Sequence, residues 1–341
     1  MRQFNHIRLL AGTVLVSLFV TASLSVNAQD IHLSQYDAPP MYLNPALTGK
    51  FNGRMRIHGH YRTQWKAIAD NPYVTTLLSG DRQMKDGFSL GAQIMNQRAG
   101  AGNFNEFRFN VSGAYDLITG TKRAGGRLSV GAQLGFIQKS FDISKLTFDE
   151  QYRITGNEGG FDPTVSMGEN LGSSSINMMD VSVGVVYFIS GESKRINPFI
   201  GYAGFHLNQP KETFFNGSNF LPMRHVVHGG VKLNLSEKVQ LTPKAWMQNQ
   251  TNDNELTTTL VMHYYLSEQN AYLIVAPTWR KDDAAIMELG MKYDDYIVRV
   301  SYDINTSPLK AATTGRGGFE ISLTWIQEKK RPDPAPNCPR L

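Results

Sequence analysis

Apolar and polar residues alternate with a period of two along most of the chain, which is the pattern of β-strands with two chemically different faces. In residues 318–327, apolar and aromatic side chains take one face, while Glu320, Ser322 and Thr324 take the other. The pattern predicts about fourteen strands, at residues 54–64, 74–83, 87–97, 104–116, 126–138, 177–189, 196–206, 224–235, 239–249, 254–266, 271–280, 284–293, 296–304 and 318–327. The polar faces carry charged side chains that need water, so they line a wet lumen or meet bulk solvent. Alternation alone leaves a soluble β-sandwich open.

The lengths of the links between these strands separate the two architectures. Every second link is short, namely residues 84–86, 117–125, 190–195, 236–238, 267–270 and 294–295. The long links, 139–176, 207–223 and 305–317, all belong to the other set. Outer-membrane barrels have this asymmetry, with short periplasmic turns and long external loops. We therefore predict an all-β protein, a transmembrane antiparallel β-barrel of about fourteen strands with both termini on the periplasmic side.

The N-terminus has the features of a secretory signal. Residues 1–28 contain Arg2 and Arg8, then an apolar stretch at 9–24, and end in the small-x-small sequence Val26-Asn27-Ala28. A retained membrane anchor is the alternative. No later stretch reaches the roughly 18 apolar residues of a spanning helix, so any membrane insertion must use strands. The predicted organisation is a signal peptide at 1–28, an N-terminal periplasmic segment at 29–53, the barrel at 54–327 and a Pro-rich basic periplasmic tail at 328–341.

Composition agrees with a barrel and restricts the chemistry. Gly accounts for 31 of 341 residues, aromatic residues for 11%, and the formal net charge is +5. The mean hydropathy of −0.30 suits strands that are half polar. No basic stripe with interleaved aromatic residues is present, so we expect no nucleic-acid partner. Cys338 is the one cysteine, which excludes an intramolecular disulfide and leaves an exposed thiol, an intermolecular disulfide or a docking contact.

Catalytic and metal-binding patterns are weak. His58 and His60 share one face of a strand, which is the spacing of a possible metal pair, but no carboxylate or third histidine lies nearby in sequence. We therefore predict that both line the lumen. No Gly-x-Ser-x-Gly nucleophile motif occurs. We expect a protein that is not an enzyme, with no catalytic, cofactor-binding or metal site.

Three parts of the chain carry a resemblance to a known family. The opening block combines Gln35-Tyr36, Asn44-Pro45, and Tyr61-Arg62 with Gln64-Trp65. A second part spans residues 301–309 and 317–323, and a third is the tail around Cys338. Together they resemble the PorP/SprF family, outer-membrane barrels of the type IX secretion and gliding systems of Bacteroidota.

The resemblance implies a non-enzymatic role in secretion or gliding motility. The expected partners are outer-membrane lipid and either a secreted adhesin-like substrate, anchored at the cell surface, or periplasmic type IX secretion components. The candidate motif or partner-contact positions are Gln35, Tyr36, Asn44, Pro45, Tyr61, Arg62, Gln64, Trp65 and Cys338. A purely structural role for these residues stays open. The alternative function is a passive channel for small solutes, which requires an open lumen, whereas an anchor can be plugged.

Overall fold

The computed structural model describes residues 30–69, 71–100, 102–118, 126–155, 158–166, 168, 173–189, 195–214 and 217–327. The predicted signal peptide and the predicted basic tail, including Cys338, lie outside the described residues. Residues 1–31 form a unit separate from residues 32–341, and the following description concerns the second unit. No helix within the described ranges is long and apolar enough to cross a membrane.

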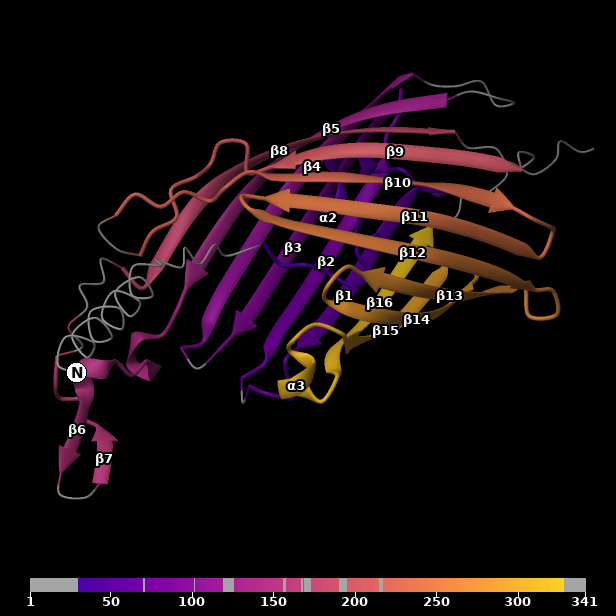
Figure 1. The fold of residues 1–341 in the computed structure, drawn as a ribbon. Helices are drawn as coiled ribbons and strands as arrows, with labels where there is room; N and C mark the ends of the chain where they lie inside the picture. The colour runs from indigo at the N-terminus through magenta and orange to yellow at the C-terminus, as the bar shows by residue number, and fades with distance from the viewer. Residues whose placement is uncertain are drawn as a thin grey trace, which may run out of the picture. The chain divides into compact units, whose positions relative to one another are not determined.

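Within the described residues, fourteen strands form one closed antiparallel barrel, which confirms the predicted fold (Figure 1). They are β1 (Met55–Gln64), β2 (Tyr73–Gln83), β3 (Phe88–Ala99), β4 (Phe104–Ile118), β5 (Gly126–Ser140), β8 (Ser175–Ile189), β9 (Ile196–Phe205), β10 (Arg224–Asn234), β11 (Val239–Gln250), β12 (Asp253–Leu266), β13 (Ala271–Arg280), β14 (Ala284–Tyr293), β15 (Tyr296–Asn305) and β16 (Arg316–Gln327). The first and last strands close the ring, from Met55 opposite Gln327 to Thr63 opposite Phe319. Closure leaves no strand edge unpaired in lipid.

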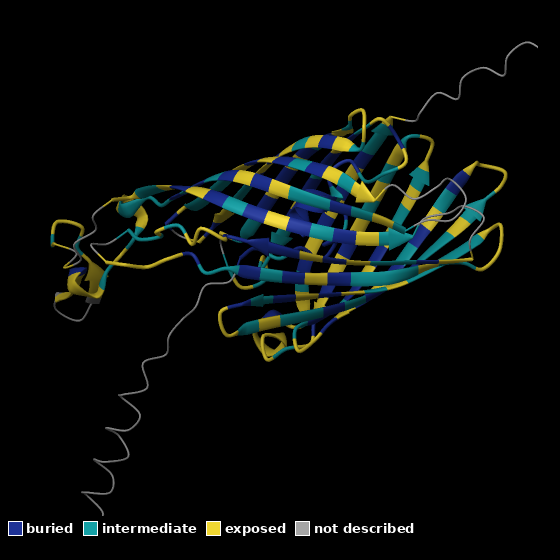
Figure 2. Ribbon diagram, turned by 90° about the horizontal axis from the view of Figure 1, so that it is seen from above, coloured by how far each residue is buried: buried dark blue, intermediate teal, exposed yellow. Residues whose placement is uncertain are grey.

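The two faces of each strand separate as the alternation predicted (Figure 2). On β16, Glu320 and Ser322 are buried inside the ring, whereas Ile321 and Leu323 are 40% and 48% exposed on its outer wall. The outer wall also carries large exposed aromatic side chains, including Tyr61, Tyr115, Tyr187, Trp279, Tyr293, Tyr296 and Tyr302. An apolar wall with aromatic residues is the surface that a bilayer requires.

The connections at the two ends of the barrel differ in length, also as predicted. At one end, β14 meets β15 through Asp294-Asp295, and β2 meets β3 through residues 84–87. At the other end lie the long links 141–174, 206–223 and 306–315. The longest of these adds elements that the alternation did not predict: η2 (Ile143–Lys145), η3 (Asp149–Gln151) and the hairpin β6 (Tyr152–Thr155) with β7 (Glu158–Phe161). The link 306–315 contains α3 (Lys310–Thr313).

The stretch before β1 lies within the ring. We predicted an N-terminal periplasmic segment at 29–53, and the structure shows that residues 32–50 of it lie inside the barrel and bond to β2, β5, β9, β11 and β16, among others. We call residues 32–50 the lumen segment. The physical reason is that the inward faces carry charged and polar side chains, and the segment supplies them with hydrogen-bond and ion-pair partners.

Candidate functional site

The lumen segment runs from one mouth of the barrel to the other. Its first residue, His32, lies 3.6 Å from Glu255, at the long-link end of β12. Its last residue, Lys50, pairs with Asp116, near the short-turn end of β4. Residues 51–54 then lead into β1 at the short-turn end. The two ends of the lumen segment therefore lie at opposite mouths.

Local sequence explains the compact middle of the segment. The single-turn helix α2 (Pro40–Leu43) has proline at its first position, where the missing N–H costs no hydrogen bond. It is followed by η1 (Pro45–Leu47), whose N-cap Asn44 accepts a 2.9 Å hydrogen bond from the Ala46 N–H. The Thr48 hydroxyl closes this turn by donating to the Pro45 carbonyl at 2.8 Å. Two consecutive short turns thus form the compact middle of the segment.

The first anchor is a carboxylate at the long-link end. Glu320 accepts hydrogen bonds from the backbone N–H groups of Ser34 at 2.6 Å and Gln35 at 2.8 Å. It also pairs with the Arg62 guanidinium, and all four residues are buried. The Ser34 hydroxyl donates to Asp303 at 2.7 Å. Charge-assisted bonds of this kind are the strong ones, because both partners are withdrawn from water.

Gln35 joins the two motifs that are far apart in sequence. Its side-chain amide donates to the Ser301 hydroxyl at 3.2 Å, and its carbonyl accepts from the Ser322 hydroxyl at 2.6 Å. Gln35 is fully buried, so both of its polar atoms depend on these bonds. The opening block and the block at 301–323 are therefore two halves of one contact.

The second anchor combines a stacked aromatic pair with an ion-paired carboxylate. The Tyr36 ring stacks on Trp246 with 5.5 Å between ring centroids. Next to it, Asp37 lies 2.5 Å from Lys244 and 3.3 Å from Arg299. Two cations thus flank this carboxylate and compensate for its withdrawal from water.

The third anchor is Asn44, which bonds to two strands at once. Its amide donates to the backbone carbonyls of Val185 on β8 and Tyr202 on β9, both at 3.1 Å, and lies 3.1 Å from His228 Nε2. This approach requires glycine in the wall, since a Cβ on Gly184 would lie 1.9 Å from the Asn44 side-chain oxygen. The inward glycine is thus part of the site.

The fourth anchor holds the segment at the short-turn end. The Gly49 N–H donates to Asp81 at 2.6 Å, and Arg56 pairs with the same carboxylate at 2.6 Å. Gly49 has a φ of +71°, and a Cβ there would lie 2.2 Å from the Ser89 hydroxyl. Glycine is therefore required at this position by both conformation and space.

The structure divides the predicted motif positions into three groups. Gln35, Tyr36, Asn44, Pro45 and Arg62 are all buried in the lumen and belong to the anchors described above. Tyr61 is 40% exposed on the outer wall, and Gln64 and Trp65 lie where β1 ends at the long-link mouth. There Trp65, with a φ of 63°, packs edge-on against Tyr73 at 4.7 Å. Most of these motif residues thus hold the lumen segment in the barrel.

The histidine pair lines the lumen, as predicted. His58 and His60 are both buried, with ring centroids 5.7 Å apart. His58 Nδ1 lies 2.8 Å from the Thr324 hydroxyl, and His60 Nε2 lies 3.1 Å from Glu320. In the part of the chain that the structure describes, no group of three or more His, Cys, Asp or Glu residues is arranged to hold a metal ion.

Several anchoring residues were not singled out from the sequence. Asp37 of the lumen segment pairs with Lys244 of the wall, and Asp81 accepts a hydrogen bond from the Gly49 N–H. Glu320 was noted only as part of the polar face and of the second block. The available signal was that charges recur on the polar face of successive strands. This signal shows that the lumen is charged, but it does not show which partner each charge meets.

A closed barrel with a charged interior and an apolar, aromatic-rich wall defines a membrane-spanning protein of the outer-membrane barrel class. The family model described as "Type IX secretion system membrane protein PorP/SprF" matches residues 25–325. The chain belongs to this family, as its motifs predicted, and is an outer-membrane protein of the type IX secretion system. No curated protein matches the chain.

Solved structures with a similar fold are distant in sequence. The CymD monoaromatic hydrocarbon channel has 14% identity and a TM-score of 0.48, with 86% of this chain and 94% of that chain covered. The toluene transporter TodX of P. putida has 10% identity and a TM-score of 0.47, with 85% and 93% covered. The translocator domain of the autotransporter NalP from Neisseria meningitidis has 11% identity and a TM-score of 0.39, with 80% and 88% covered.

Proposed function

We propose that this protein is a plugged, non-enzymatic outer-membrane scaffold of the type IX secretion and gliding system. It holds an exported, adhesin-like partner at the cell surface or links the membrane to periplasmic secretion components. The observation that supports this proposal is the lumen segment, which is held by backbone hydrogen bonds to Glu320 near one mouth, by the ion pairs of Asp37 with Lys244 and Arg299, and by the Lys50–Asp116 ion pair near the other mouth. A passive channel for small solutes is the alternative, and it would require this segment to leave.

The anchors argue against ready exit of the segment. Withdrawing it strips Glu320 of two backbone donors and separates Asp37 from Lys244 and Arg299. Breaking a buried ion pair by removing one partner costs about 3–5 kcal/mol, although water entering an emptied lumen recovers part of this. A barrel sealed in this way suits a scaffold that works through its two mouths rather than through a pore.

We further propose that the short turns face the periplasm and the long links face the cell exterior, as is usual in outer-membrane barrels. This orientation revises the expectation for the N-terminus. His32 lies at the long-link mouth, whereas β1 begins and β16 ends at the short-turn mouth. The start of the mature chain would then lie on the cell-surface side, and the tail after Gln327 on the periplasmic side.

Two measurements on the full chain test the proposal. Affinity purification of the tagged protein from solubilised outer membranes, followed by mass spectrometry, is expected to recover one large exported protein or periplasmic secretion components in stoichiometric amounts. The same preparation in planar bilayers is expected to show no steady conductance. A lone barrel that conducts ions would overturn the scaffold and favour the channel.

A further inference from the structure

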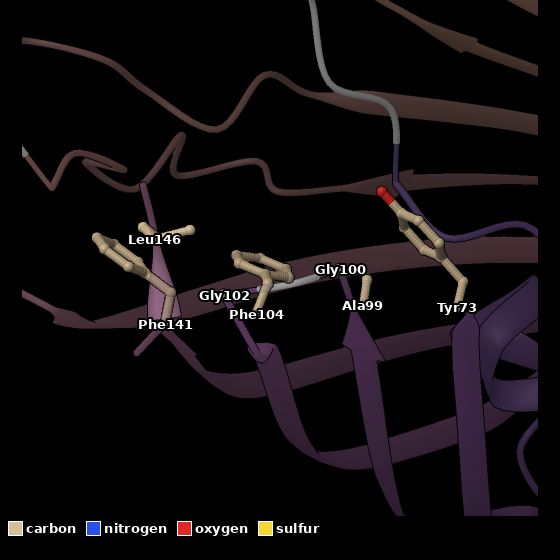
Figure 3. Close-up of a pocket in the computed structure, with 7 residues that line it drawn as sticks. All are labelled: Tyr73, Ala99, Gly100, Gly102, Phe104, Phe141 and Leu146. Carbon is tan, nitrogen blue, oxygen red and sulfur yellow. The ribbon is translucent and has the colours of Figure 1, made fainter. Parts of the chain in front are cut away.

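An apolar pocket opens beside the lumen at the long-link mouth (Figure 3). It has a volume of about 390 Å³, which falls in the lower range for binding pockets in proteins. Its lining is carbon-rich and consists of Tyr73, Ala99, Gly100, Gly102, Phe104, Phe141 and Leu146. In Figure 3 the Tyr73 hydroxyl is the one polar atom among the labelled side chains.

The alternation of the strands places this pocket on the inner side of the wall. Tyr73 and Phe104 have the same parity as the buried lumen residues Thr75 and Glu106, two positions further along β2 and β4. The pocket therefore faces the mouth of the lumen and not the lipid. Apolar surface beyond the apolar belt of a barrel meets water unless a partner covers it.

Contacts between loops hold the pocket in shape. The Asp142 N–H donates to the Gly102 carbonyl at 2.7 Å, which ties the long link after β5 to the β3–β4 turn. Leu146 fills the space above Gly102, where a Cβ would lie 2.6 Å from its methyl carbon. Behind the pocket, Phe141 packs edge-on against Phe214 at 4.8 Å. The pocket is thus preformed, which lowers the entropic cost of binding.

The link that forms one wall of the pocket is acidic. Among the side chains of residues 141–174 that the structure describes, Asp142, Asp149, Glu150 and Asp162 stand against Lys145 and Arg153, and Lys145 lies 3.9 Å from Asp142. The Ser144 hydroxyl, hydrogen-bonded to Asp142, lowers the pKa of that carboxyl, and Thr164 does the same for Asp162. Asp149 and Glu150 are exposed. The described part of this link therefore carries a net negative charge at neutral pH, which complements a cationic partner.

The same link also offers an unpaired strand edge. In the described part of the chain, β6 and β7 pair with each other and with no further strand. Ile154 on this hairpin is 76% exposed. Open strand edges bind extended peptides through backbone hydrogen bonds, while neighbouring pockets select side chains.

We infer that the long-link mouth binds an extended, basic segment of an exported polypeptide, with one large apolar side chain seated in the pocket lined by Phe104, Phe141 and Leu146. This inference rests on the proposed scaffold function and adds the chemistry of its partner. The acidic link selects for lysine and arginine, and the pocket selects for an aromatic or branched aliphatic residue. A free apolar ligand alone would not use the acidic link.

The test measures peptide binding to the full-length protein in phospholipid nanodiscs, since a detergent tail would compete for an apolar pocket. The probe is a fluorescent eight-residue peptide of alternating Lys and Phe, compared with Glu-Phe and Lys-Ser peptides of equal length. Anisotropy is expected to show binding of the Lys-Phe peptide, at least tenfold weaker binding of the other two, and weakening by salt.

Two pairs of variants localise the binding. Leu146→Arg, which fills and charges the pocket, is expected to weaken Lys-Phe binding at least tenfold, while Leu309→Arg at the exposed start of α3 leaves it unchanged. The double variant Asp149→Asn, Glu150→Gln is expected to weaken binding of the Lys-Phe peptide several-fold. The control Asp282→Asn, in the β13–β14 turn, is expected to leave this binding unchanged. Circular dichroism and unheated gel migration verify that each variant folds.

The outcomes separate this inference from the proposed function. Equal binding of the Lys-Phe and Lys-Ser peptides, or full binding to Leu146→Arg, would overturn the pocket assignment. If Leu146→Arg still recovers the exported partner in stoichiometric amounts, the scaffold stands and the pocket does not. If the Lys-Phe peptide binds as expected but the wild type conducts ions and recovers no partner, the scaffold fails while the basic-apolar site remains.

Discussion

Replacing Glu320 with alanine tests whether the lumen segment is held by its hydrogen bonds to this buried carboxylate. The substitution leaves Arg62 with Asp303, 3.2 Å away, and deprives the N–H groups of Ser34 and Gln35 of their acceptor. With the segment in place these groups are buried without a partner, whereas water reaches them when it is displaced. Each of these two hydrogen bonds to a charged acceptor contributes about 1.5–3 kcal/mol, so the plugged state should lose about 3–6 kcal/mol relative to the displaced state. At about 1.4 kcal/mol per tenfold, the displaced fraction rises between about a hundredfold and about ten-thousandfold.

The assay is the rate at which a bulky maleimide labels Ala38→Cys in a Cys338→Ser background. Ala38 is buried in the lumen segment, so labelling requires displacement and its rate follows the displaced fraction. Glu320→Gln, which keeps an acceptor oxygen, should show an intermediate rate, and Glu268→Ala in an exposed turn should match the unaltered background. A labelling rate in Glu320→Ala within about threefold of the background would refute the reasoning, because it would mean that the two hydrogen bonds to Glu320 together contribute less than about 1 kcal/mol.

Three further predictions follow from the same geometry. Asp37→Asn removes the charge that pairs with Lys244 and Arg299, so maleimide should label Ala38→Cys at least tenfold faster than in the background; an unchanged rate would argue against these ion pairs. Gly184→Ala places a Cβ 1.9 Å from the Asn44 side-chain oxygen and should lower the midpoint temperature of thermal unfolding. Gly59→Ala, whose Cβ meets nothing within 4 Å, should leave that midpoint unchanged, and equal midpoints for the two variants would argue against close packing of the segment. An epitope inserted after Ala28 should be detected by antibody on intact cells, whereas one inserted after Gln327 should require permeabilisation, and the reverse result would contradict the proposed orientation.

The contacts in the charged lumen show how much of the site the sequence motif could predict. Gln35, Tyr36 and Asn44 were recognisable as a block typical of a family, but their partners lie more than a hundred residues away, on β8 to β16. Nothing in the local pattern distinguishes a segment that binds a foreign partner from one that binds its own barrel. The structure favours the second interpretation for these buried positions, because their polar side-chain atoms already bond to the barrel wall or to the segment itself.

The position of the N-terminus shows a second limit of prediction from sequence. An even number of strands does place the start of β1 and the end of β16 at the same mouth, and the structure agrees. The inference that the mature N-terminus also lies there assumed that the preceding residues stay outside. Residues 32–50 instead pass through the ring, a choice that depends on contacts made only once the barrel has closed.

By itself, the sequence determined the strands, their inward and outward faces and the asymmetry of the links, because side-chain alternation and turn residues are local properties of the chain. Family membership was also readable, since it rests on short motifs. Tertiary structure alone decided what fills the lumen, which charges pair, and where the apolar pocket lies at the mouth. These features depend on distances between residues far apart in sequence, such as Ser34 and Glu320, and closure of the ring sets those distances.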